Sequence, residues 1–217
     1  PLSFLRADCS PRVPLCRIES SPMALKLEYT PAELIAELER QGAQAQVLAA
    51  GLSDAALNWQ PNGGKGWSVL QCLDHLAIMN AKYVEALQDA VASNQDQLEP
   101  RKVPLRPSGW FTRWFIGMEE PPPRLKLPAP KKISPPSKLT AAVVEEFCAL
   151  QKQLADFVRE WGDADLGDLK VKDPLFPLHL TADTQLLIIS YHNRRHLWQA
   201  ENVKKNAGFP STSVPAS

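Results

Sequence analysis

Two helix-start signals, each followed by a long apolar stripe, decide the fold class of this sequence. Residues 30–33 read Thr-Pro-Ala-Glu, which places a capping threonine, a proline at the first helical position and a glutamate three residues after the cap. Residues 68–71 read Ser-Val-Leu-Gln, which is a second capping box. Apolar side chains then recur at helical spacing in both segments. The pattern predicts one helix from Thr30 to Gly51 and a second over about 68–92.

Two more helices are predicted in the second half of the chain. Over about 139–161, large apolar residues recur at three- and four-residue spacing, as on a buried helical face. A further helix is capped by Thr181 and runs to Asn206, with Gly208 and Pro210 beyond its end. Strand alternation is absent outside a few loop residues. Four long helices joined by loops therefore predict an all-α four-helix bundle.

A proline-rich insert separates the second and third predicted helices. Residues 93–136 hold ten of the chain's 20 prolines, so no long regular element is expected there. Inside this insert lies an aromatic cluster, WFTRWF, at 110–115. We interpret the cluster as a short helix or turn that covers apolar surface of the bundle, because so much aromatic surface is costly to expose to water. The alternative is a lid or wall of a substrate pocket.

The ends of the chain carry no helical pattern. The first residues lack the basic and apolar regions of a signal peptide, so we expect residues 1–25 to be a disordered extension. The bundle domain is expected over 26–210, followed by a tail at 211–217. The longest aliphatic run, 186–189, is far shorter than the roughly 20 residues that span a membrane.

Charge and cysteine content restrict the partners and the compartment. The 24 Lys and Arg residues balance the 24 Asp and Glu residues, with no long run of like charge. We therefore expect neither nucleic acid nor a membrane surface as a partner. The four cysteines show no C-x-x-C spacing, and the two in predicted helices are typical of small buried apolar side chains. A cytoplasmic protein is expected.

Three of the four histidines form the candidate functional site. His192 and His196 stand at i and i+4 on the last predicted helix, with Cβ atoms about 6 Å apart. Two such imidazoles can reach one metal ion at about 2.0–2.1 Å. His75 lies at the edge of the apolar stripe of the second helix and can supply a third ligand. Asn193 follows His192, so the glutamate base of an H-E-x-x-H metalloprotease is absent.

Other side chains have two interpretations each. The histidines themselves can instead be packed or surface residues. His179 is interpreted as a loop histidine, with a fourth ligand as the alternative, and Cys72 as a buried apolar residue, with a soft-metal ligand as the alternative. Gln71 and Gln199 are placed either to orient the histidine rings or to cap helices and face solvent.

Two segments carry a resemblance to a known family. Residues 67–76 (WSVLQCLDHL) and 191–199 (YHNRRHLWQ) resemble the tryptophan-led helix start and the final H-x-x-x-H helix of the DinB-like (DinB/YfiT) superfamily. The resemblance implies a four-helix bundle whose second and fourth helices supply a three-histidine metal site. In this sequence His75, His192 and His196 fill the matching places. The superfamily includes thiol-dependent transferases and isomerases and metal-dependent hydrolases, and dimers are common in it.

These observations lead to two functional hypotheses. The first is a metal-dependent hydrolase or thiol S-transferase that holds one divalent ion, zinc or nickel, and acts on a small molecule, with low-molecular-weight thiols among the candidates. A homodimer is expected, and no catalytic residue is assigned beyond the metal ligands. The second is a non-catalytic bundle, with a structural metal or packed histidines, that acts as a protein-interaction module through the aromatic segment around Trp110 and Trp114.

Overall fold

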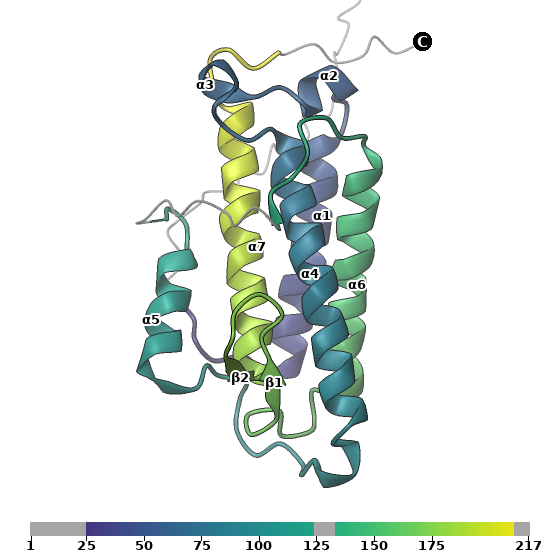
Figure 1. Ribbon diagram of the computed structural model, residues 1–217, viewed down its shortest axis with the longest axis vertical. Helices are drawn as coiled ribbons and strands as arrows, with labels where there is room; N and C mark the ends of the chain where they lie inside the picture. Colours follow the sequence, from purple (N-terminus) through teal and green to yellow (C-terminus); the bar gives the residue numbers. More distant parts are fainter. Residues whose placement is uncertain (1–24, 124–132, 211–217) are drawn as a thin grey trace, which may run out of the picture.

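Four long helices lie side by side in an elongated bundle (Figure 1). The computed structural model describes residues 25–123 and 133–210, so most of the expected extension, the tail 211–217 and part of the insert lie outside the described residues. Helix α1 packs against α6 and α7, and α4 packs against the same two helices. The predicted all-α bundle is confirmed. The long helices are α1 (Pro31–Ala49), α4 (Val69–Ala92), α6 (Ala142–Trp161) and α7 (Ala182–Lys204).

The predicted capping boxes set the starts of α1 and α4. The Glu33 amide donates to the Thr30 side chain, and the Thr30 amide donates to the Glu33 carboxylate. Ser68 and Gln71 make the same reciprocal pair of hydrogen bonds at the start of α4. A cap of this kind stabilises a helix by about 1 kcal/mol. Helix α6 has no side-chain cap and begins slightly later than the apolar pattern suggests.

The core fills the space between the four long helices. Burying one such aliphatic or aromatic side chain contributes roughly 1.5–3 kcal/mol. Cys72 belongs to this core and is fully buried, as expected for a small apolar side chain. In the described ranges no helix combines the length and apolar character needed to cross a bilayer. The largest fully buried side chains include Leu34, Leu38, Leu73, Leu76, Phe147, Leu154 and Tyr191.

A small hairpin, which the sequence analysis did not predict, precedes α7. Strands β1 (Lys170–Lys172) and β2 (His179–Thr181) pair antiparallel, with Val171 opposite Leu180. Three-residue strands are too short for an alternating pattern to be recognised. The hairpin leads directly into α7, because Thr181 ends β2 and its hydroxyl caps that helix.

Among the described residues, the connectors contain only short elements. Helices α2 (Asp54–Leu57) and α3 (Pro61–Gly64) lie between α1 and α4, and a 3-10 turn, Gln95–Gln97, follows α4. The insert then forms α5 (Gly109–Glu119), which packs against α7 (Figure 1). A short helix was one of the expectations for this segment. It fits within the proline-free stretch of the insert.

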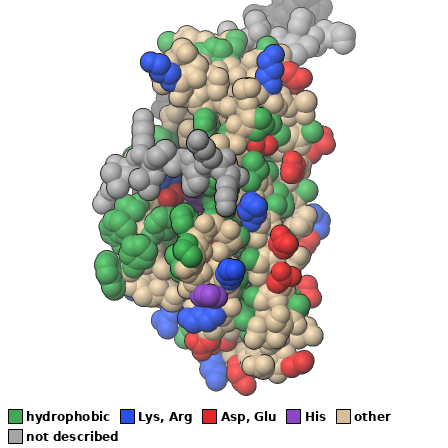
Figure 2. All heavy atoms as spheres, viewed as in Figure 1, with side chains coloured by type: hydrophobic (Ala, Val, Ile, Leu, Met, Phe, Trp, Pro, Cys, Tyr) green, Lys and Arg blue, Asp and Glu red, His purple; other side chains and the backbone are tan. Residues whose placement is uncertain are grey.

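The aromatic face of α5 points away from the bundle, so the expectation that its rings cover apolar surface is wrong for three of them. Trp110, Phe111 and Trp114 are 79%, 55% and 52% exposed. Thr112 and Ile116 are buried instead, because a spacing of four residues puts them together on the face toward α7. Figure 2 shows apolar side chains gathered over α5.

Candidate metal centre

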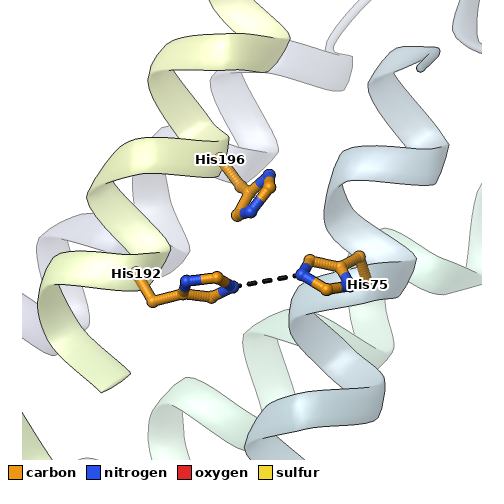
Figure 3. A group of neighbouring side chains, drawn as sticks. All are labelled: His75, His192 and His196. Carbon is orange, nitrogen blue, oxygen red and sulfur yellow. Dashed lines mark hydrogen bonds between the residues drawn. The ribbon is translucent and has the colours of Figure 1, made fainter. Parts of the chain in front are cut away.

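The three candidate histidines come together between α4 and α7 (Figure 3). One ring nitrogen from each of His75, His192 and His196 lies within 4.8 Å of the other two. We call this group the histidine triad. His75 and His196 are buried, and the His192 side chain is 17% exposed. The structure therefore brings together the three histidines that the sequence singled out, and they could hold a metal ion.

Hydrogen bonds behind two of the rings fix which nitrogen faces the centre of the triad. His75 Nδ1 lies 2.8 Å from the Ile133 carbonyl oxygen, and His192 Nδ1 lies 3.0 Å from Glu119 Oε2. A carbonyl and a carboxylate only accept hydrogen bonds, so both Nδ1 atoms carry the proton and donate. In the neutral rings, both Nε2 atoms are then left with a bare lone pair.

Those two lone pairs face each other. His75 Nε2 lies 3.1 Å from His192 Nε2. Two bare lone pairs at this distance repel unless a proton or a cation lies between them. Two imidazole nitrogens bound to one tetrahedral ion at about 2.0–2.1 Å are about 3.3 Å apart. The spacing of the pair therefore fits a shared metal ion.

His196 is a buried ring with an unused nitrogen. It is 8% exposed, and among the described residues its Nδ1 has no hydrogen-bond partner. A buried polar atom without a partner usually costs about 1–3 kcal/mol. Trp67 stacks on this ring with centroids 5.5 Å apart and also contacts His75 at 4.9 Å. The indole therefore covers one side of His75 and His196.

The buried rings are held neutral. Burial, aided by the nearby His192, lowers the pKa of His75 to about 4 against the effect of the Ile133 carbonyl. Burial and then the nearby His192, His75 and Arg195 hold the pKa of His196 well below its ordinary value, and the Gln199 side chain opposes them only weakly. A neutral imidazole is the form that binds metals. Both rings are therefore in the ligand-competent form at neutral pH.

Sequence reasoning missed a pair of carboxylates at the end of α5. Glu119 is 5% exposed and lies between His192 and Arg195, whose Nη1 is 3.2 Å from Glu119 Oε1. Burial alone would raise the pKa of this carboxyl, but the hydrogen bonds and charges of His192 and Arg195 hold it below its ordinary value. Glu120 pairs with Arg194 at 2.6 Å. Nothing in the local spacing of Glu119 points to a histidine 73 residues away.

The other candidate residues lie outside the triad. His179 is exposed on β2 and lines an open groove of about 560 Å³ between α4 and the hairpin. It is therefore not a fourth ligand. Gln71 is used by the capping box and by a hydrogen bond to the Pro136 carbonyl, not by a ring. Cys72 is packed in the core.

A comparison with models of protein families finds a match for this chain. The model of a protein family described as the DinB superfamily matches residues 37–200. This region contains all three histidines of the triad, the α5 insert and nearly all of the bundle. No curated protein and no solved structure matches the chain.

Proposed function

This chain belongs to the DinB superfamily, and from that premise we propose that the histidine triad binds one divalent metal ion in a metal-dependent enzyme that acts on a small molecule. The observation that carries the proposal is the 3.1 Å approach of the His75 and His192 Nε2 atoms, with both Nδ1 atoms already committed to acceptors. The position of buried His196, which brings a ring nitrogen within 4.8 Å of those of the other two histidines, supports it. Two bare lone pairs at this distance repel in a metal-free core, whereas both nitrogens are satisfied when they bind one ion.

The ligand set favours late first-row ions. Imidazole suits zinc and nickel, and the usual affinity order does not choose between them. Three side chains leave room for a further ligand, which is typical of catalytic rather than structural sites. When bound, such an ion supplies a Lewis acid and lowers the pKa of a water or thiol that binds it.

The surroundings of the triad suit a reaction of hydrolase or thiol S-transferase type. Trp67 covers one side of the rings and keeps water from it, whereas His192 is the most exposed of the three. The buried Glu119 carboxylate adds a negative charge behind His192, and the neutral rings of His75 and His196 add none. A small ester or a low-molecular-weight thiol is the substrate class we propose.

Metal content tests the proposal. After purification without chelator, we expect the wild-type protein to carry about one equivalent of zinc or nickel by plasma mass spectrometry. A double variant, His192→Ala with His196→Ala, should carry little. The variant His179→Ala is the matched control, because it removes an exposed histidine outside the triad and should bind metal like the wild type. Equal metal content in wild type and double variant would overturn the proposal.

The exposed rings of α5 favour a second candidate function. Trp110, Phe111 and Trp114 offer a contiguous aromatic surface of the kind that protein partners bind. In this alternative the bundle is a non-catalytic interaction module in which any metal is structural. Metal-dependent turnover of a small thiol or ester by the purified protein would contradict it.

A further inference from the structure

Two residues of the insert, Glu119 and Ile133, reach the histidine triad. Glu119, the last residue of α5, accepts a hydrogen bond from His192, and the Ile133 carbonyl, farther along the insert, accepts one from His75. Each contact is made to Nδ1, at the back of a ring whose Nε2 faces the other histidines. The insert thus holds two of the three rings from behind.

We propose that Glu119 is a positioning residue of the metal centre, which holds His192 in the tautomer and orientation that present Nε2 to the ion. The proposal rests on the metal site proposed above. If the His192 ring can rotate about its side-chain bonds, or move its proton to Nε2, part of the protein population has the ring in a form that cannot bind the ion. A buried carboxylate 3.0 Å from Nδ1 removes both freedoms.

The carboxylate is itself held in place. Glu119 Oε1 lies 3.2 Å from Arg195 Nη1, and Arg195 stands three residues after His192 on α7. One carboxylate therefore bridges two side chains of the same helix face. Because Oε2 faces the ring nitrogen that is directed away from the centre, Glu119 supports a ligand and is not placed to be one.

The neighbouring Glu120 provides the matched control. Its carboxylate bonds Arg194 at 2.6 Å and makes no hydrogen bond with the triad among the described residues. Loss of Glu120 removes a carboxylate and an ion pair at the same end of α5. Any effect that merely reflects loosening of the insert should therefore appear in Glu120→Ala as well.

The experiment compares Glu119→Ala, Glu119→Gln and Glu120→Ala with the wild type in two measurements. Zinc affinity, from competition with a chromophoric chelator, should fall about 10- to 100-fold in Glu119→Ala. It should fall less in Glu119→Gln, whose amide oxygen still accepts from Nδ1, and remain unchanged in Glu120→Ala. Nitrogen-15 spectra of the metal-free proteins at pH 8 should show His192 protonated at Nδ1, except in Glu119→Ala, where the Nε2-protonated form should increase.

Two results would overturn the proposal. One is wild-type affinity together with the wild-type His192 tautomer in Glu119→Ala. The other is a loss of affinity without any change of tautomer, which would mean that the substitution disturbs the insert and not the ring. If the wild type itself binds no zinc, the proposed function fails, but the tautomer measurement in metal-free protein still decides the role of Glu119.

Discussion

At the scale of single residues, the atoms behind the histidine rings decide what those rings can do. A neutral imidazole has one donor and one acceptor nitrogen, so an acceptor placed at Nδ1 selects Nε2 as the free nitrogen. The Ile133 carbonyl and the Glu119 carboxylate make this selection for His75 and His192. Orientation fixed in advance lowers the entropy lost when a ligand binds.

One residue-scale prediction concerns the start of α1. Hydrogen bonds from Lys26 and then from the Thr30 amide lower the pKa of Glu33 from 4.5 to about 2. Because the folded-state pKa is depressed, the stabilisation from this carboxylate is present above about pH 4.5 and is lost as the pH falls toward 2. We expect carbon-13 carboxyl shifts to titrate near 2 in the wild type and higher in Lys26→Gln. A pKa near 4.5 for Glu33 in the wild type would contradict this prediction.

The sequence predicted the three histidines of the site but not the groups that orient them. His192 and His196 are recognisable because helical spacing places them on one face, and His75 because it borders an apolar stripe. Glu119 and the Ile133 carbonyl meet the rings across 73 and 58 residues. A backbone carbonyl has no sequence signature, and a carboxylate next to a proline run looks like any surface residue. That the triad binds metal stays a prediction.

At the scale of elements, one buried amide fixes the rotation of α7. Asn193, between the two histidines of that helix, donates to Gln41 of α1 at 3.0 Å and to Gln151 of α6 at 3.2 Å, and it accepts from Asn80 of α4 at 3.2 Å. Each of the other three long helices thus contacts the same side chain. The amide directs Asn193 into the core and so turns His192 toward α4.

Loss of the Asn193 amide should strongly reduce the stability of the folded protein. Asn193→Ala removes this partner from one buried amide atom on each of three helices, and we expect the free energy of unfolding to fall by about 3 kcal/mol in urea titrations. Gln44→Ala is the control, since Gln44 also bridges α1 to α7, through Glu201, but at the partly exposed edge of the bundle. The free energy of unfolding should fall by less than about 1 kcal/mol in Gln44→Ala. Equal costs for the two variants would contradict a special role for Asn193.

Elements with strong local signals were predictable, and those set by packing were not. The four long helices carry caps and apolar periodicity, and three of them start where a capping residue stands. The direction in which α5 faces depends on its contact with α7, so the aromatic content alone gave the wrong expectation for its exposed rings. The hairpin before α7 is too short to produce a pattern.

At the scale of the whole molecule, the functional site depends on parts distributed along most of the chain. The bundle supplies the triad from α4 and α7, and the insert supplies the groups that hold two of the rings. The domain limits 26–210, the homodimer and the cytoplasmic location stay predictions. A ligand that binds several distant segments at once stabilises the folded state as a unit.

Removal of the metal should therefore lower the melting temperature. At a free ion concentration about 100 times the dissociation constant, the ion contributes about 2.7 kcal/mol, which for a chain of this length corresponds to roughly 5–10 °C. We expect calorimetry to show this decrease when chelator is added to the wild type and its reversal when zinc is restored. The His192→Ala, His196→Ala variant should not respond to chelator. An identical response of both proteins would contradict metal binding at the triad.

The separation of the triad along the chain also bears on the time at which the site forms. His75 and His192 are 117 residues apart. Individual helices form in about a microsecond, whereas contacts between distant segments must wait for closure of the intervening chain. The rings of His75 and His192 can thus meet only after α7 has docked on α4. Capture of an ion during refolding would then mark the end of the folding reaction, and a chain stalled before that docking would remain unable to bind it.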